Sequence, residues 1–202
     1  YDGDPRVACL TMGILGHWGE WHSYPRTKLF PGKEYQIHIM DQFEKSFKQT
    51  PILMRYVAGD DDYDYAPNAE RPFGFHDDSF AWATLDTGKE DDDWFFMAKV
   101  KTAKVLDAWK TRMIGGEIRP ELWGCVFDDE SCEVKGQELD RCIDATHATW
   151  LMDSGMFGEK GEPSAERIRN ATKSVSKLGY EFFVPSAKVS SDDGTTNAEV
   201  VM

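Results

Sequence analysis

The sequence predicts an α/β fold built on a parallel sheet, because apolar runs typical of buried strands alternate with amphipathic, helix-like segments. Each predicted strand ends in aromatic and ionisable residues. A doubly wound open sheet is the alternative architecture, but no GxGxxG or Walker loop follows any of these strands. Barrel enzymes gather polar residues where successive parallel strands end, so part of a TIM (β/α)8 barrel is the preferred architecture.

The predicted strands are short apolar runs that lead into polar residues. They start near Val7, Pro51, Phe73, Met113 and Ala148. The run at 7–16 is almost entirely apolar, as expected of a strand that is buried on both faces. Because no element precedes it with which it can pair, we expect the chain to be a fragment.

Helices are expected where apolar residues recur three and four positions apart, which gives each helix one hydrophobic face. They span 33–49, 94–112, 137–144 and 163–178. Residues 1–180 are assigned to the partial barrel. The remaining residues, 181–202, are assigned to the start of a C-terminal β-strand region, with a strand at 181–189 and a polar tail at 190–202.

Composition excludes two classes of partner. The net charge of -13, with 23 basic and 36 acidic residues, does not suit nucleic acid, because phosphate neutralisation requires clustered Lys and Arg. No apolar run reaches the roughly 18 residues of a membrane span. Neither nucleic acid nor a membrane is therefore expected as a partner.

Two segments carry the candidate chemistry: Gly13-Ile-Leu-Gly-His-Trp-Gly-Glu-Trp-His22 after the first strand, and Ile114-Gly-Gly-Glu-Ile-Arg119 at the fourth. They resemble an uncharacterised family of secreted (β/α)8 barrels, a domain of unknown function similar to the large clan of retaining glycosidases. In that clan a general acid/base Glu ends strand four and a nucleophile Glu ends strand seven. The resemblance implies that the chain holds strands 4 to 8, with Glu20 as acid/base and Glu117 as nucleophile.

The same resemblance implies partners for this half-barrel. Strands one to three would come from sequence not present here or from another chain. A C-terminal β-sandwich, mostly absent, would be entered at 179–184. The chain departs from the clan pattern at Gly19, which stands where the clan has Asn before the acid/base Glu.

Retaining hydrolysis needs one protonated and one ionised carboxyl group on opposite sides of a sugar ring. Glu20, between two tryptophans, is expected to be partly desolvated and to keep its proton, and Arg119 is expected to keep Glu117 ionised. The other candidates are aromatic residues that can stack on sugars and polar residues that can bind hydroxyls or an acidic group. They are Trp18, Trp21, Trp150, His22, Arg55, His76, Asp77, Asp78 and Arg119.

No metal or cofactor is expected. The acidic run at 60–64 imitates the start of an EF-hand loop, but Tyr65 replaces the required Gly and Arg71 replaces the bidentate Glu. His17, Glu20 and His22 lack the HExxH helix spacing of a zinc site. No GxSxG elbow supports an esterase triad.

Cysteines and a sequon indicate an oxidising compartment. Two of Cys125, Cys132 and Cys142 are expected to form a disulfide that ties the loop after the fourth strand to the following helix, whereas Cys9 is expected to be a reduced core thiol. Asn170-Ala-Thr172 is a candidate glycosylation site. The chain is therefore expected to be secreted.

The preferred function is a retaining glycosidase that acts on an extracellular polysaccharide. The alternative is a non-catalytic barrel that binds glycan or serves as a structural module in an extracellular assembly. Fold alone does not separate them. A carboxyl separation of about 5 to 5.5 Å across an open cleft would favour the retaining enzyme.

Overall fold

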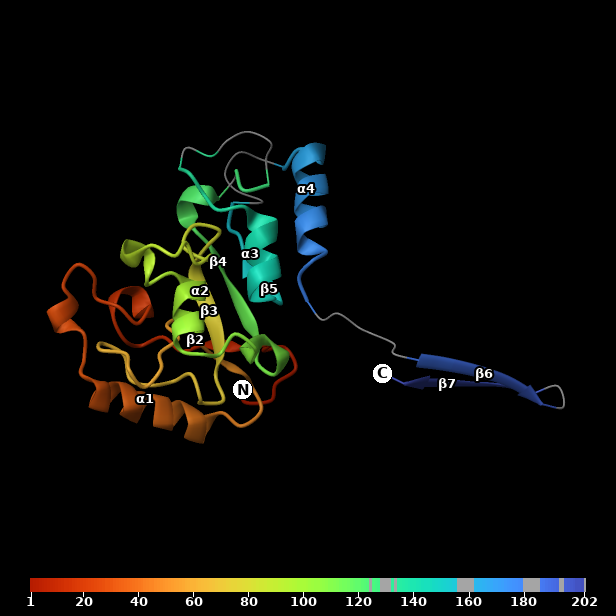
Figure 1. Cartoon of the computed structure of the whole chain (residues 1–202), viewed down its shortest axis with the longest axis horizontal. Helices are drawn as coiled ribbons and strands as arrows, with labels where there is room; N and C mark the ends of the chain where they lie inside the picture. The colour runs from red at the N-terminus through yellow and green to blue at the C-terminus, as the bar shows by residue number, and fades with distance from the viewer. Residues whose placement is uncertain are drawn as a thin grey trace.

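The computed structural model describes residues 1–123, 125–127, 132, 134–155, 162–179, 186–192 and 195–201. Its centre is a five-stranded half-barrel sheet in which every neighbouring pair is parallel and the strand order is β1-β2-β3-β4-β5 (Figure 1). The strands are β1 Leu10–Thr11, β2 Ile52–Met54, β3 Gly74–Phe80, β4 Ile114–Ile118 and β5 Trp150–Met152. Parallel strands in chain order confirm the predicted succession of strand-helix-strand units.

The helices connect or follow these strands. They are α1 Lys33–Ser46, α2 Phe96–Thr102, α3 Leu139–Thr146 and α4 Ala165–Val175. Single 3-10 turns lie at His17–Gly19, Thr27–Leu29, Glu90–Asp92, Ala108–Lys110 and Pro120–Leu122. None of the helices described is long and apolar enough to cross a membrane.

The second helix is much shorter than the predicted 94–112. It stops because Lys104 adopts a left-handed conformation with φ 61°. The amides of Lys104 and Val105 then donate to the carbonyls of Lys101 and Val100 at 3.0 and 3.1 Å, which is the Schellman pattern that satisfies the end of a helix. Glycine usually occupies this position, so the sequence shows no stop at Lys104.

The four helices of the described residues pack on one face of the sheet. One apolar cluster joins Ile52, Met54, Phe75 and Ile114 to residues of α1 and α2, and a second joins Ile118 and Leu151 to residues of α3 and α4. The register places these strand residues on the same side, since Met54 pairs with Phe75 and Phe75 with Ile114. Helices on one face only are typical of a barrel wall and not of a doubly wound sheet.

The other face of the sheet includes two glycines. Side chains alternate along a strand, so Gly74 and Gly115 lie on the face that carries no helix. A Cβ at Gly74 would lie 2.5 Å from the Leu53 side chain, and one at Gly115 would lie 2.2 Å from Nε1 of Trp150. Larger neighbouring side chains therefore fill the space that these glycines leave.

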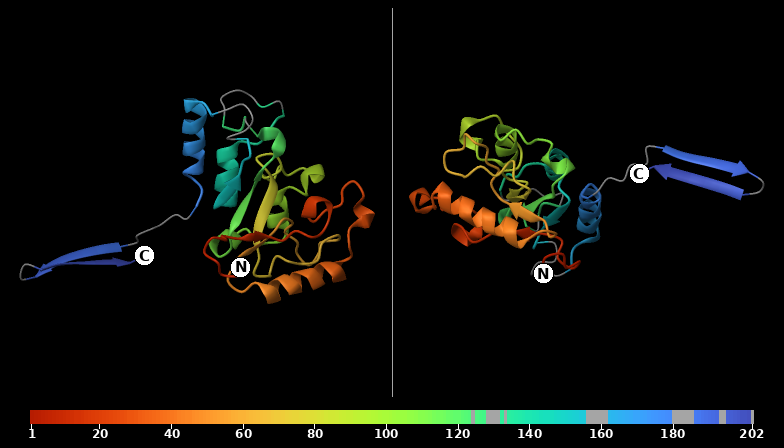
Figure 2. Two further views of the ribbon diagram at one scale, coloured as in Figure 1. Left: turned by 180° about the vertical axis from the view of Figure 1, so that it is seen from behind. Right: turned by 90° about the horizontal axis from the view of Figure 1, so that it is seen from below.

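The C-terminal residues form a hairpin in place of the predicted polar tail. β6 Ser186–Asp192 and β7 Thr195–Val201 pair antiparallel, with Ser186 opposite Val201. Figure 1 and both views of Figure 2 show the hairpin apart from the sheet and its helices. The tail prediction was wrong because Thr and Val, which favour strands, alternate with polar residues here. The predicted entry into a sandwich at 180–184 lies outside the described residues.

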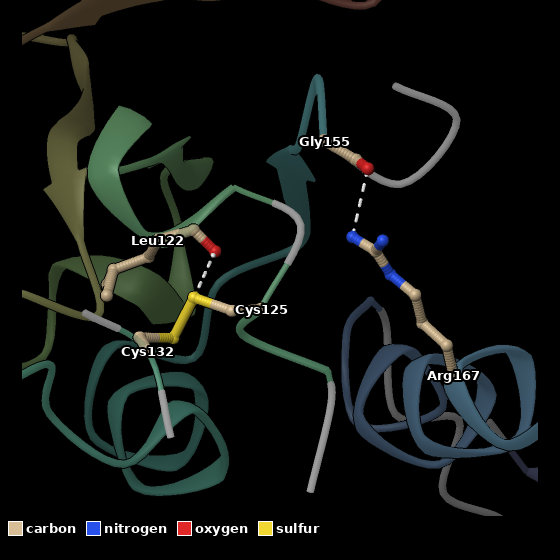
Figure 3. The surroundings of a disulfide bond; sticks show 5 residues. All are labelled: Leu122, Cys125, Cys132, Gly155 and Arg167. Atoms are coloured by element: carbon tan, nitrogen blue, oxygen red, sulfur yellow. Dashed lines mark hydrogen bonds between the residues drawn. A yellow bond between two sulfur atoms is a disulfide. The ribbon is translucent and has the colours of Figure 1, made fainter. Parts of the chain in front are cut away.

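A disulfide joins Cys125 to Cys132, with a Cα–Cα distance of 5.4 Å (Figure 3). The prediction that two of the three nearby cysteines are bridged is confirmed. The predicted link to the following helix is wrong, because Cys142 of α3 is a free thiol buried in the second apolar cluster. Cys9 is also free, as predicted, although it is only half-buried.

Replacing both bridge cysteines by serine is expected to destabilise the fold modestly. The bridge closes a loop with a sequence separation of 7, and a loop that short is worth about 2 kcal/mol in the chain-entropy model. Urea unfolding of the oxidised protein and of the Cys125→Ser/Cys132→Ser variant measures the difference. Equal unfolding free energies would show that the bridge does not constrain the unfolded chain.

Candidate active site

The loop that follows β1, residues 13–22, folds back on itself and carries Glu20. The amide of His17 donates to the carbonyl of His22 at 2.7 Å, and the amide of Trp21 donates to the carbonyl of Leu15 at 2.9 Å. A Cβ at Gly16 would lie 2.2 Å from the His22 carbonyl oxygen, so this position needs glycine. The tight loop places Glu20 near the carboxyl end of β2.

This loop contains unusual backbone conformations. Ile14, Trp18 and Trp21 have φ values of 78, 52 and 57°. Left-handed backbone is rare for residues other than glycine and is strained for a β-branched residue such as Ile14. Surrounding contacts must therefore hold the loop in this form.

Trp21 makes the contacts that keep the loop at 13–22 in this conformation. Its side chain is only 1% exposed and packs in the first apolar cluster. Its Nε1 donates to the carbonyl of Met12 at 2.7 Å. The prediction that Trp21 stacks on a sugar is wrong, because a buried indole presents no face to a ligand. Trp18, in contrast, is 86% exposed and remains available for stacking.

Glu20 lies in a chain of charged contacts. Its Oε2 is 3.1 Å from Nη1 of Arg55 and 3.3 Å from Nε2 of His22. Nε of Arg55 is in turn 2.6 Å from Oδ1 of Asp78. Arg55 follows β2 and Asp78 belongs to β3, so one guanidinium connects three successive strand ends.

Both nearby imidazoles are uncharged at neutral pH. Burial and the charge of Arg55 lower the pKa of His22 below its ordinary 6.5. The same two causes lower the pKa of His76 to about 4. Among the described residues that contact Glu20, Arg55 therefore supplies the positive charge at neutral pH.

Glu117 lies on the same face of the sheet as Arg55 and Asp78. It is the half-exposed member of β4, between buried neighbours. Burial raises the pKa of Glu117, and the negative charge of Glu20 raises it further. This second cause connects β4 with the loop after β1, which carries Glu20.

Arg119 does not hold Glu117 ionised, contrary to the sequence-based prediction. The strand ends at Ile118, and a 3-10 turn starting at Pro120 changes the chain direction. The guanidinium pairs with Glu121 at 2.7 Å and lies 4.1 Å from the ring centre of Trp82. Arg119 is therefore not part of the carboxylate cluster.

Trp150 of β5 and His76 of β3 lie side by side on the same face as Glu117. Their rings stack with a centroid distance of 5.6 Å and an interplanar angle of 23°. The indole nitrogen is buried and has no hydrogen-bond partner among the described residues. Gly115 lies directly beneath it, so any side chain at that position would displace Trp150.

Asp77 was also predicted to bind substrate, and the structure contradicts this. Its side chain points to the other face of β3, where it is buried. It accepts hydrogen bonds from Oγ1 of Thr84 at 2.6 Å and from the amide of Ser79 at 3.0 Å. Asp77 and Asp78 both line the small cavity that Arg55 borders, but the carboxylate of Asp77 is occupied by its hydrogen bonds from Thr84 and Ser79.

The sequence did not reveal the residues behind Arg55. Tyr56 and Tyr65 stack with a centroid distance of 4.5 Å. Together with Lys99, Tyr56 lines a small cavity beside Arg55 and Asp78 that has room for about one water molecule. Tyr65 directly follows the acidic run at 60–64, and no spacing rule links it to Tyr56.

An ion pair holds the acidic loop against α2. Oδ2 of Asp62 is 2.7 Å from Nζ of Lys99, and its Oδ1 accepts from the amides of Asp64 and Tyr65. No group of three or more potential metal ligands occurs among the described residues.

The candidate glycosylation site lies in α4. Nδ2 of Asn170, the atom that would carry a glycan, donates to the carbonyl of Phe127 at 2.9 Å and is half-buried. Attachment in the folded chain would require this nitrogen to turn toward solvent.

Comparison with known proteins gives no matching family model, no matching curated protein and no matching solved structure.

Replacing Trp21 by Phe is expected to destabilise the fold and to loosen the loop at 13–22, which carries Glu20. The substitution removes a hydrogen bond to a buried carbonyl, which costs about 1 to 3 kcal/mol. Chemical unfolding measures this loss, and Trp18→Phe is the matched control because that side chain is exposed. Equal effects of the two substitutions would contradict the anchoring role of Trp21.

Proposed function

We propose that this chain is part of a (β/α)8-barrel glycoside hydrolase that acts on an extracellular polysaccharide through Glu20 and Glu117. One arrangement carries the proposal: Glu117 is the half-exposed residue of β4, and Glu20, in the loop after β1, is 3.1 Å from Arg55, which follows β2 on the same face. The charge of Glu20 also raises the pKa of Glu117. Paired carboxyl groups with different environments are what two-step glycoside hydrolysis requires.

Two features of the sheet support a complete barrel. Helices cover one face only, and β1 and β5 each pair with a single neighbour among the described strands. Closing the sheet would pair both edges and enclose the polar face. In this proposal residues 1–180 supply strands 4 to 8, and the N-terminal half of the barrel comes from further sequence or another chain. The hairpin of β6 and β7 would belong to a C-terminal β-sandwich.

In this proposal Glu117 is the acid/base and Glu20 is the nucleophile, which is the reverse of the clan pattern. Glu117 retains its proton more readily because burial and the charge of Glu20 raise its pKa. Glu20 is 3.1 Å from Arg55, whose guanidinium can hold its carboxyl group in place for attack. Glu117 would donate its proton to the leaving oxygen while Glu20 forms a bond to the anomeric carbon. Water would then hydrolyse this glycosyl ester, with Glu117 accepting the proton.

Four further side chains would bind the sugar. Trp18 and Trp150 offer aromatic surface for stacking on pyranose faces, and His22 and His76 are neutral imidazoles that can exchange hydrogen bonds with hydroxyl groups. The disulfide supports a secreted protein, since such bonds persist in oxidising compartments.

A non-catalytic glycan-binding module is the second candidate. The observation that favours it is the 86% exposure of Trp18, an aromatic surface that needs no catalytic pair to hold a sugar. Glycan binding that depends on Trp18, without turnover in any assay, would select this function.

Azide rescue of two alanine variants tests the catalytic pair. Glu117→Ala is expected to slow hydrolysis of natural glycosides by about 10²- to 10⁴-fold, which is the usual contribution of acid/base catalysis. It should still react with aryl glycosides that have good leaving groups, and azide should then give a glycosyl azide of retained configuration. Glu20→Ala should lose turnover with both substrates.

Product analysis by NMR measures the configuration, and Glu34→Gln on the exposed start of α1 is the control for folding. Retained azide from Glu20→Ala instead of Glu117→Ala would reverse the roles. Wild-type rates in both variants would show that Glu20 and Glu117 are not catalytic.

A further inference from the structure

We propose that Asp78 is a positioning residue that shares one proton with Glu20, and that together with Arg55 it fixes the direction and charge of the Glu20 carboxylate. This inference deepens the proposed function, because it explains how one member of the pair is held ready. It also makes a claim about protonation that can be measured without turnover.

The geometry of Asp78 favours a proton on its second oxygen. Its side chain is only 4% exposed, and Oδ1 is 2.6 Å from Nε of Arg55. Its other oxygen, Oδ2, is buried and receives no hydrogen bond from the described residues. The Asp78 and Glu20 carboxyl groups both contact the guanidinium of Arg55, and a side-chain hydrogen bond between the two is one cause of the raised pKa of Asp78. Two ionised carboxylates can only accept, so this contact becomes a hydrogen bond only when one of them is protonated.

The net charge of Arg55, Asp78 and Glu20 also favours a proton on one of the two carboxyl groups. One guanidinium contacts two carboxyl groups, at 2.6 and 3.1 Å, so full ionisation leaves an excess negative charge in a partly buried place. The titratable and charged groups around Asp78 lie on the loop after β1, after β2, on β3, on β4 and on α2. They are Glu20, His22, Arg55, Tyr56, His76, Asp77, Glu117 and Lys99.

These neighbours leave the excess charge uncompensated. His22 and His76 are neutral because burial and Arg55 lower the pKa of each. Lys99 is engaged by Asp62 at 2.7 Å. Burial, followed by the charges of Glu20 and Asp77, outweighs the effect of Arg55 and raises the pKa of Asp78 to about 8. At neutral pH Asp78 therefore carries the proton and can donate it in a hydrogen bond to Glu20.

This arrangement has a consequence for function. Glu20 is held by two donors from different strands, Arg55 and protonated Asp78, which restrict it to one direction. When Asp78 loses its proton, two anions compete for one guanidinium and the second donor is lost. The position of Glu20 is then expected to loosen as the pH rises through about 8.

Carboxyl titration by NMR tests the shared proton directly. In the full chain labelled with ¹³C-carboxyl aspartate, one aspartate is expected to titrate near pH 8. Asp78→Asn should remove that titration, and Asp77→Asn should keep it because Asp77 faces the other side of β3. Glu20→Gln should lower the pKa of Asp78 by removing the neighbouring charge.

Stability gives a second readout. Asp78 has an ordinary pKa of 3.8 when unfolded and about 8 when folded. The folded chain thus binds a proton that the unfolded chain releases, so this contribution to stability is complete below about pH 4 and is lost as the pH rises through about 8. The unfolding free energy of Asp78→Asn should depend less steeply on pH in that range.

A glycosidase assay provides the third readout. Asp78→Asn keeps a hydrogen-bond donor and should retain turnover while losing the alkaline limb of the pH profile of kcat. Asp78→Ala should lower kcat by about 10²-fold with a smaller effect on KM, as expected for a misplaced reacting group. No aspartate that titrates above pH 6, or one that persists in Asp78→Asn, would overturn the proposal. If that titration is present but no variant or wild type hydrolyses any glycoside, the shared proton stands and the glycosidase function fails.

Discussion

The architecture depends on the covering of a single face of the parallel sheet. Side chains alternate along each strand, and one set of apolar strand residues, including Ile52, Phe75, Ile114 and Ile118, turns toward the helices. The opposite face is thereby free to hold residues that no packed interior would accept without partners. Arg55, Asp78 and Glu117 occupy that face, and each retains a polar surrounding because no helix lies over it.

Arg55 determines how this polar face is organised. A single guanidinium cannot neutralise two carboxyl groups, and burial together with the positive charge of Arg55 keeps His22 and His76 neutral. The excess negative charge is therefore relieved by a proton on Asp78. Burial first, and the neighbouring charges second, set the protonation states along the strand ends.

Sequence patterns predicted the sheet and the edge that carries the chemistry, because both follow from hydrophobic alternation and from where apolar runs stop. They did not predict features that depend on a single backbone angle. Lys104 ends a helix in a left-handed conformation normally taken by glycine, and Pro120 turns Arg119 away from Glu117. Asp77 and Asp78 are adjacent and chemically identical in the sequence, so only the strand register assigns one to the core and the other to the site. Trp21 was misassigned because tryptophan serves equally well in a core and on a binding surface.

The strained loop at 13–22 links the integrity of the site to that of the core. Its backbone is held by the insertion of Trp21 among residues of the first apolar cluster, including Met12. A segment held in this way opens only when the cluster around it opens, so it belongs to the same cooperative unit as β1 and β2. Glu20 therefore keeps its position as long as this unit is folded, and loses it when the unit unfolds. On an ordinary surface loop the position of a carboxylate would fluctuate locally. Here, displacing Glu20 requires the core around Trp21 to open, which costs unfolding free energy.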